Sequence, residues 1–271
     1  MIYVIIALAV LAFLTAAWVF AVRGRRNHPG LAALQGWKYA HRGLHGEGRP
    51  ENSMAAFRAA LDAGYGIELD IHLMKDGQLA VIHDASLRRT AGQGVKIEEL
   101  TAAQLKDYPL EGTEETIPLF SQVLALFAGK APLIIELKSE NNNYAQLAEA
   151  ACKAMEGYEG SWCMESFDPR CVRWLKVNKP QVIRGQLAEN FVKRNKKLPL
   201  VLRFAVTHHL LNFLLVPDFV AYLFDDRKSL SNFLVRKLWG VQGVSWTLKK
   251  QEDLDAATAE GWLPIFEGFR P

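Results

Sequence analysis

The chain has few cysteines, and their arrangement excludes the common roles of paired thiols. Cys152, Cys163 and Cys171 are the only three among 271 residues. They form neither an even framework nor a Cys-x-x-Cys pair, so a disulfide-stapled scaffold is not indicated. We expect reduced thiols in a reducing compartment, although the sequence leaves a single disulfide open.

A strong excess of charge of either sign is also missing. Lys and Arg total 32 against 29 Asp and Glu, which gives a formal net charge of +3. The basic residues gather at 23–26 and 193–197, without the interleaved aromatics or the motif of a nucleic-acid-binding surface. A nucleic acid is therefore not expected as a partner, and no protein partner is indicated. Internal repeats and low-complexity tracts are absent from the sequence.

Charge is entirely missing from residues 2–22. At about 1.5 Å of rise per residue, a helix of this length crosses a hydrocarbon core of about 30 Å. A secretory signal peptide would have basic residues before its apolar core, whereas here Arg23, Arg25 and Arg26 follow it. We therefore expect a single-pass membrane anchor over 1–24 and a juxtamembrane linker over 25–36. The positive-inside rule then places the rest of the chain in the cytoplasm.

From residue 37 onward, short apolar runs alternate with helical stretches. This pattern is typical of βα units and a parallel sheet. Eight parallel strands close a barrel, and about 250 residues suit one, so the fold expected over 37–271 is an α/β TIM barrel. The candidate strands are 38–41, 67–72, 133–138, 162–166, 182–186, 219–224, 243–247 and 263–267. The candidate helices are 53–63, 117–128, 144–156, 169–178, 229–238 and 252–260.

An excursion interrupts the repeat after the second strand. Asp76-Gly77 is a strong hairpin signal, so residues 79–84 should return antiparallel to the second strand. A turn centred between these two residues sets His83 opposite Asp70. The segment 85–116 is then expected to be an insertion before the next barrel helix.

Carboxylates alternate with apolar residues in two of the candidate strands. Glu68 and Asp70 share one face of the second strand with His72, and Glu136 shares a face with Lys138. In isolated strands these would be solvated faces, but in a barrel one face lines the lumen, where carboxylates must be paired or hold a cation. Glu68, Asp70 and Glu136 are therefore predicted to bind one divalent metal ion, Mg²⁺ or Ca²⁺, with Mn²⁺ a further option. Lys138 is left as a point charge for a phosphate.

Two histidines are brought to the same cluster. His41 ends the first strand, and His83 lies on the returning arm of the hairpin. A lone histidine in an apolar run is most often structural, but two beside a cation site predict acid–base cleavage of a phosphodiester. One histidine would remove a proton from the attacking oxygen and the other would protonate the leaving alkoxide. The cation, Arg42 and Lys138 would stabilise the developing charge.

These residues, in this order, resemble the glycerophosphodiester phosphodiesterase family in its membrane-anchored bacterial type. The resemblance implies hydrolysis of glycerophosphodiesters to an alcohol and glycerol 3-phosphate at the C-terminal strand ends. It also implies that Arg42 and Lys138 contact phosphate, that Asn52 supports them, and that Trp246 lies at the pocket mouth. On spacing alone Trp246 fits the core equally well. The motifs are His41-Arg42-Gly43, Glu51-Asn52-Ser53, Glu68-Leu69-Asp70, Lys75-Asp76-Gly77, His83-Asp84, Glu136-Leu137-Lys138, Ser166-Phe167-Asp168 and Trp246-Thr247.

One departure from the family pattern and two further readings remain. Glu267 stands where the family often has Thr-Asp, which puts the contribution of the last strand in doubt. The apolar stretch 198–224 is expected to hold a buried barrel helix, with part of it as an apolar lip resting on the bilayer. Such a lip would favour lysophospholipase D-type cleavage of lysophospholipids. The alternative hypothesis from another class of function is a non-catalytic, membrane-attached lipid-binding module.

Overall fold

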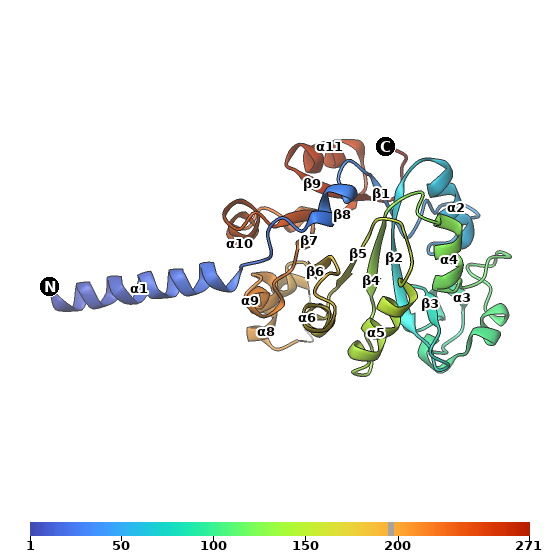
Figure 1. Ribbon diagram of the computed structural model, residues 1–271, viewed down its shortest axis with the longest axis horizontal. Coiled ribbons are helices and arrows are strands. Elements are labelled where there is room, and N and C mark those ends of the chain that lie inside the picture. The colour runs from blue at the N-terminus through green and yellow to red at the C-terminus, as the bar shows by residue number, and fades with distance from the viewer. Residues whose placement is uncertain (195–197) are drawn as a thin grey trace.

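The computed structural model describes residues 1–194 and 198–271, in which eight parallel strands close into a barrel inside a layer of helices (Figure 1). β1 pairs with both β2 and β9, and this double pairing closes the ring. The expected eight-stranded α/β barrel is therefore confirmed. The barrel strands are β1 (Tyr39–His41), β2 (Gly66–Leu73), β4 (Leu133–Leu137), β5 (Trp162–Ser166), β6 (Arg184–Ala188), β7 (Phe219–Leu223), β8 (Gln242–Leu248) and β9 (Trp262–Phe266).

The helices between the strands begin where the sequence provides caps. Ser53 accepts a hydrogen bond from the Ala56 amide at the start of α2, and Asp168 caps α6 ahead of Pro169. The segment expected as one helix over 229–238 is instead a short α10 followed by a π-helical turn, η5. The elements are α2 (Met54–Asp62), α4 (Phe120–Phe127), α5 (Tyr144–Ala154), α6 (Pro169–Asn178), α7 (Phe191–Arg194), α8 (Leu200–Thr207), α9 (Asn212–Leu215), η4 (Phe224–Asp226), α10 (Leu230–Phe233), η5 (Leu234–Leu238) and α11 (Gln251–Ala259).

Strand alternation divides the apolar residues between two cores. Ile67, Leu69 and Ile71 of β2 face outward and pack in one cluster with residues of the surrounding helices, such as Phe57. Residues of the opposite faces fill the half of the lumen in which the strands begin. We call this half the lower lumen, and Phe219 of β7 is fully enclosed in it. The β6 residue Gly185 makes this possible, because a Cβ atom there would lie 2.1 Å from the Phe219 ring. The lumen is therefore a packed core at this end and not a pore.

The segment 25–36 closes the lower end of the barrel. Its 3₁₀ helix η1 (Pro29–Leu34) buries Leu31 and Leu34 in the same cluster as the lumen residues. The hydroxyl of Tyr39 donates a hydrogen bond of 2.7 Å to the carbonyl of Leu34. The segment expected to be a linker thus packs against the barrel along much of its length.

The segment 85–116 forms a small satellite with its own apolar cluster. It contains α3 (Arg88–Ala91), η2 (Ile97–Glu99) and η3 (Ala102–Asp107). Leu87, Ile97 and Leu105 pack with Ile82 from the return of the hairpin. The small insertion expected after the second strand is therefore present.

The hairpin register differs by one residue from the expectation. β3 (Leu79–Val81) pairs antiparallel with β2, and Ile71 faces Val81, so the amide of Ile82 and not His83 bonds the Asp70 carbonyl. The loop is closed by the Met74 amide and the Gln78 carbonyl. It therefore has three residues, with Gly77 at a positive φ of 80°, where a two-residue loop was assumed.

The N-terminal helix α1 (Ile2–Ala21) projects away from the barrel as a single rod (Figure 1). None of its residues is buried against the protein. It is long and apolar enough to cross a membrane, the one such helix among the described residues. Length and composition are also compatible with a signal sequence.

Candidate functional site

Three carboxylates converge at the end of the lumen where the strands end, which we call the upper end. Glu68 and Asp70 come from β2 and Glu136 from β4, and the parallel register sets Asp70 directly beside Glu136. Each of the three offers an oxygen within 4.8 Å of the others, and all three side chains are buried. The strand alternation thus brings together the three residues predicted as metal ligands, in the number and chemistry that a hard divalent cation takes.

The loop after β1 aims a backbone amide and a guanidinium at this cluster. Arg42 adopts a positive φ of 54°, an unusual conformation for a long side chain, and its amide donates to the Glu68 carboxylate at 3.2 Å. Its guanidinium lies 2.9 Å from Glu51 and 3.3 Å from Asp70. The next residue, Gly43, has no room for a side chain, because a Cβ atom would lie 2.9 Å from the Ala56 backbone. This close approach explains the glycine of the His-Arg-Gly motif.

Asn52 and Lys138 complete the contacts of Asp70. The Asn52 side-chain amide donates to the Asp70 Oδ2 at 2.9 Å, and the Asn52 backbone amide donates to the Arg42 carbonyl. The Lys138 Nζ lies 3.0 Å from Glu136 and 3.7 Å from the Asp70 Oδ1. The predicted phosphate-binding residues Arg42 and Lys138 therefore flank the carboxylates, one directly after β1 and the other directly after β4.

The electrostatics of the carboxylates fit a cation. Burial and the neighbouring carboxylates Asp70 and Glu136 raise the pKa of Glu68 well above its usual range. Burial also raises the pKa of Glu136 to about 7, against the opposing effect of Lys138. Asp70 has the reverse balance: burial opposes ionisation, but Lys138, His83 and Arg42 together lower its pKa. Its Oδ1 atom is buried and accepts no hydrogen bond from the described residues. A divalent ion would supply the missing positive charge and the missing partner.

The two predicted acid–base histidines both lie at the cluster. The His41 Nε2 lies 3.8 Å from Glu68, and the His83 Nδ1 forms a 2.6 Å hydrogen bond with Asp84. Burial is the main cause that lowers the pKa of each imidazole, while the charge of Asp70 acts on both in the opposite direction. Although the hairpin register was wrong by one residue, His83 still lies within electrostatic reach of Asp70.

Trp246 lies on the lumen face of β8, one ring away from the charged cluster. It packs edge-on against Phe167 at 5.6 Å between ring centroids, and the Lys138 Nζ is 6.0 Å from the centre of the Phe167 ring. The indole Nε1 is buried and has no hydrogen-bond partner among the described residues. A buried donor without a partner is available to a ligand.

Sequence reasoning missed two contributors to the site. Glu165 of β5 is buried in register with Glu136, and the alternation rule applied to the second and third strands would have found it. Burial and the charge of Glu136 raise its pKa well above the usual range. The other contributor is His45, whose Nε2 lies 3.2 Å from the Glu267 carboxylate. That carboxylate also lies 3.2 Å from the His41 Nδ1, so the last strand does reach the site. No local sequence signal connects residues so far apart in the chain.

A pocket of about 510 Å³ opens beside the cluster. Its polar lining lies around the ends of β4 and β5 and consists of Glu136, Lys138, Ser139, Glu140, Ser166, Asp168 and Arg170. The opposite wall is apolar and comes from the residue after β5, from α7 and α8, and from a residue shortly before α8. This wall consists of Phe167, Phe191, Leu198, Leu202 and Val206.

The fold and the site together define a TIM barrel of the enzymatic type, in which the polar cluster lies at the carboxyl ends of the strands. The family model for the glycerophosphoryl diester phosphodiesterase family matches residues 41–261. The chain belongs to this family. A glycerophosphodiester phosphodiesterase of Caldanaerobacter subterraneus subsp. tengcongensis is 30% identical over 232 residues, which cover 82% of this chain and 89% of that protein.

Other relatives match over shorter segments or in fold alone. A glycerophosphodiester phosphodiesterase of Bacillus altitudinis is 41% identical over 39% of this chain, and the match spans 46% of its own length. A lysophospholipase D of Rattus norvegicus is 38% identical over 38% of this chain and 36% of its own length. The structure of an Oleispira antarctica phosphodiesterase in complex with the product sn-glycerol-3-phosphate superposes with a TM-score of 0.72, at 19% identity, over 90% of this chain and 95% of that one. At this identity the likeness shows the fold.

Proposed function

We propose that the protein hydrolyses glycerophosphodiesters to an alcohol and glycerol 3-phosphate, with acid–base catalysis by His41 and His83 and dependence on a divalent metal ion. The observation that carries this proposal is the convergence of three buried carboxylates, two histidines and two basic side chains at one end of the lumen. The family membership and the product named for the Oleispira antarctica structure support the same reaction.

Glu68, Asp70 and Glu136 would hold the metal ion. Mg²⁺, Ca²⁺ and Mn²⁺ all accept such an all-oxygen set, so the identity of the ion is a matter for experiment. When bound, the ion withdraws charge from the phosphate and stabilises the negative charge that develops during cleavage. The Asn52 amide keeps Asp70 oriented through its 2.9 Å hydrogen bond.

The protein's own groups perform the remaining steps. Arg42 and Lys138 bind the phosphate oxygens, since both positive charges lie beside Asp70 and neither side chain is fully buried. The histidines divide the proton transfers: one takes the proton of the attacking oxygen, and the other gives a proton to the leaving alkoxide. Burial favours the neutral form of the rings, which suits the base, and the charge of Asp70 favours the protonated form, which suits the acid. Trp246 would help to shape the pocket beside Phe167.

Turnover of glycerophosphocholine by detergent-solubilised protein tests the proposal. EDTA should abolish hydrolysis, and one of the three cations should restore it. Arg26→Gln, which changes an exposed residue outside the site, serves as a matched control and should retain full activity. Folded, metal-loaded protein that turns over no glycerophosphodiester would favour the lipid-binding module.

A second candidate activity is lysophospholipase D-type cleavage of lysophospholipids. The specific observation is the apolar wall of the pocket, which begins beside Lys138 and could accommodate an acyl chain. The lysophospholipase D of Rattus norvegicus among the relatives supports this alternative. Parallel assays with glycerophosphocholine and lysophosphatidylcholine separate the two. Replacing Leu202 by Asp should reduce turnover of the lysophospholipid alone if the wall binds the chain.

We further propose that α1 crosses a membrane once and leaves the barrel in the cytoplasm. The helix is apolar along its whole length and is followed by Arg23, Arg25 and Arg26. Resistance of the membrane-bound protein to alkaline carbonate extraction would support a spanning helix. Proteolysis of right-side-out vesicles would test the orientation, because a cytoplasmic barrel should be protected.

A further inference from the structure

The inner end of α1 is fixed to the barrel by several independent contacts. Val22 is fully buried among Val220, Val235 and Val241. The indole of Trp239 donates a 2.8 Å hydrogen bond to the carbonyl of Val19. Immediately after the helix, the guanidinium of Arg25 pairs with the buried carboxylate of Asp218. These contacts leave the barrel little freedom to rotate relative to α1. A membrane that contains α1 must therefore lie close to the surface surrounding its inner end.

That surface is unusually apolar for a protein exterior. We call it the α1 flank: the solvent-facing parts of α8, α9, α10 and η5, which surround the inner end of α1 in Figure 1. The sequence predicted a buried helix in this region, with part of it as an exposed apolar lip, and in α8 only Thr207 is buried. Val201 is 82% exposed. The large exposed apolar side chains of the flank are Leu200, Val201, Leu202, Phe204, Leu214, Leu230, Phe233 and Leu238. Scattered single exposures are normal, whereas a group of this size marks a contact surface.

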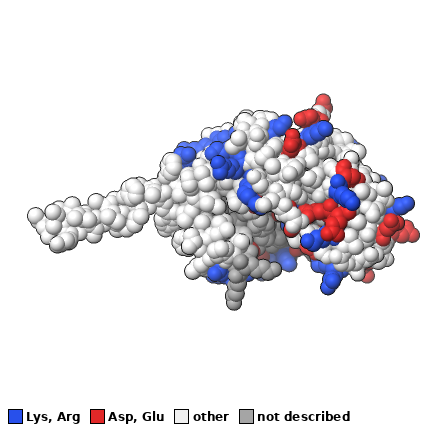
Figure 2. Space-filling view, turned by 90° about the horizontal axis from the view of Figure 1, so that it is seen from below, with Lys and Arg blue, Asp and Glu red and all other residues white. Residues whose placement is uncertain are grey.

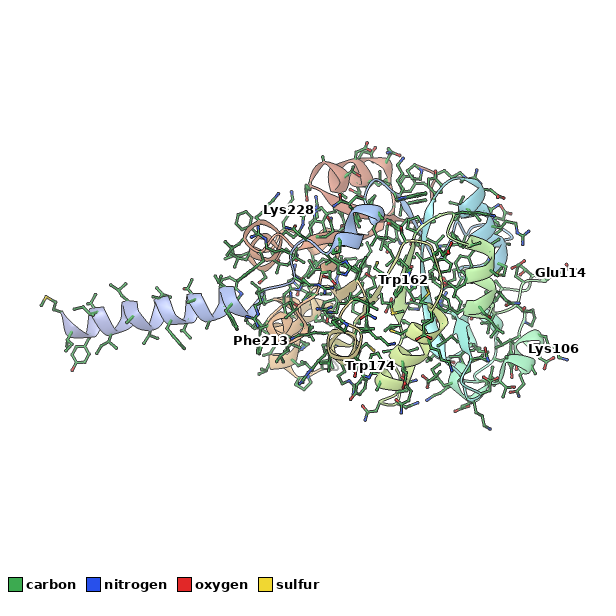
Figure 3. The ribbon with its side chains drawn as sticks, in the orientation of Figure 1. Lys106, Glu114, Trp162, Trp174, Phe213 and Lys228 are labelled. Carbon is green, nitrogen blue, oxygen red and sulfur yellow. The ribbon has the colours of Figure 1, made fainter. Side chains whose placement is uncertain are left out.

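Positive charge accompanies the apolar side chains. Arg23 follows the C-cap residue of α1, and the Lys176 Nζ of α6 donates a 2.7 Å hydrogen bond to the Leu214 carbonyl of α9. Burial and then the charges of Arg184, Arg23 and Arg173 lower the pKa of Lys176. Lys228, two residues before α10 (Figure 3), and Lys237 of η5 are exposed. None of these residues except Arg184 forms an ion pair with a carboxylate among the described residues. In Figure 2 the side chains beside the inner end of α1 are blue and white, and red gathers on the far side of the domain.

A cleft between α1 and α8 joins the helix to this surface. It has a volume of about 530 Å³ and is lined by Ala17, Trp18, Ala21, Phe204, His208 and Leu210. Almost the whole lining is apolar, which suits a hydrocarbon chain better than water. Trp18 of α1 and Trp239, whose indole bonds the Val19 carbonyl, both lie at the inner end of α1. Aromatic residues of membrane proteins gather at this position, at the interface between lipid and water.

We infer that the α1 flank docks on the bilayer surface, with its apolar side chains among the lipid headgroups and upper acyl chains and its basic side chains on anionic lipid phosphates. This inference rests on the proposed membrane-spanning role of α1 and adds a second, surface contact of the barrel itself. α8 carries Leu202 and Val206 toward the catalytic pocket and Phe204 toward the cleft. Docking therefore holds the apolar wall of the pocket beside the lipid phase.

Fluorescent probes on the full chain in nanodiscs test the inference. The three native cysteines are buried thiols, so a cysteine added on the surface can be labelled selectively. Val201→Cys and Phe233→Cys place a probe on the flank, and Glu114→Cys places one on the insertion, far from α1 (Figure 3). With nitroxide-headgroup lipids in phosphatidylcholine and phosphatidylglycerol discs, we expect strong quenching at 201 and 233 and none at 114. Equal quenching at 201 and 114 would overturn the inference.

Two controls separate the possible failures. A probe at Leu8→Cys, in the middle of α1, reports insertion through lipids that carry a nitroxide on the acyl chain. Quenching at 8 without quenching at 201 leaves the anchor intact and rejects the flank, whereas loss of both rejects the anchor. A probe at 201 that is shielded from aqueous iodide but not quenched by lipid would indicate a second protein copy on the flank, and would also reject bilayer docking. Hydrolysis of glycerophosphocholine by the same samples reports the catalytic proposal independently.

Two matched variants test whether docking requires the basic side chains of the flank. The double variant Lys228→Glu and Lys237→Glu should lose quenching at 201 in discs containing phosphatidylglycerol, because each basic side chain near an anionic surface contributes to binding. Lys106→Glu, an exposed lysine on the insertion, should leave the signal unchanged (Figure 3). Identical quenching in the double variant and the wild type would show that charge has no part in docking and would overturn that half of the inference.

Discussion

The two halves of the barrel lumen are built from the same strands yet have opposite chemistry. In the lower half Tyr39, Ile134 and Cys163 pack with Phe219 and are closed from below by η1. Two residues further along the same strands, the corresponding lumen positions are His41, Glu136 and Glu165. One step of the strand repeat, about 7 Å, separates a dry apolar core from a charged cluster.

The comparison shows how the barrel tolerates a destabilised site. Buried carboxylates that raise one another's pKa cost free energy in the absence of a cation, and Arg42 adds backbone strain beside them. The lower half contains no such conflict, because its side chains are apolar and closely packed. Stability and function are therefore assigned to different layers of one lumen.

The largest effect should come from the upper half. His41→Gln should reduce kcat/KM for glycerophosphocholine by about 10²–10⁴, the usual contribution of a general acid or base. The thermal unfolding midpoint should stay within a few degrees of wild type, since the side chain is only partly buried. Activity within tenfold of wild type would remove His41 from the proposed mechanism.

The lower half should respond in the opposite way. Phe219→Ala should lower the free energy of unfolding by about 3–5 kcal/mol, because the ring is enclosed and the cavity left behind cannot be filled. Protein that remains folded should keep the kcat of wild type. Urea unfolding and steady-state assays on one preparation measure both quantities. A large fall in kcat in folded protein would mean that the two halves are coupled.

A buried histidine outside the lumen gives a pH dependence that must be separated from that of the site. Burial lowers the pKa of His209 from 6.5 to about 4, and its Nε2 donates to Asn232 at 2.7 Å. The unfolded chain therefore binds a proton before the folded one, so stability falls as the pH decreases from about 6.5 to 4. The loss should be about 3 kcal/mol, and most of it should disappear in His209→Gln. Unfolding free energies at pH 7, 5.5 and 4.5 would measure it. An equal slope in both proteins would contradict the assignment.

The smallest effect concerns Glu267, which contacts His41 of the charged half. The Glu267 carboxylate accepts from the His41 Nδ1 and the His45 Nε2, and these bonds lower the pKa of Glu267 well below its usual range. Glu267→Gln should reduce kcat by about tenfold through looser positioning of His41, with little change in KM. Lys249→Gln removes a charge that contacts the other oxygen of Glu267 and serves as the control. Equal kcat values in the two variants would assign Glu267 a purely structural role.

Much of the site followed from strand periodicity alone. Alternation in residues 67–72 and 133–138 predicted that Glu68, Asp70 and Glu136 share the lumen, and they do. The same rule extended to 162–166 would have added Glu165. The hairpin register, predicted separately from the Asp76-Gly77 turn, was wrong by one residue. The number of residues in the loop depends on which amide closes it, and an Asp-Gly pair is compatible with more than one answer.

The α8 to α10 region was harder to predict for a different reason. A run of leucine, valine and phenylalanine indicates removal from water, and the sequence cannot tell protein burial from contact with lipid. The sequence therefore left a buried helix and an exposed apolar lip side by side, whereas the structure exposes most of α8 and sets α1 beside it.

The sequence by itself determined the barrel, the facing of its strand residues and the apolar length of α1, because these depend on local periodicity and run length. Only the tertiary structure decided that Glu267 meets His41 across 226 residues, that η1 closes the lower lumen, and that α1 leaves from the apolar flank. The contact of Glu267 with His41 arises when the last strand pairs with the first and closes the ring. That event depends on all eight strands at once and leaves no trace in any short segment.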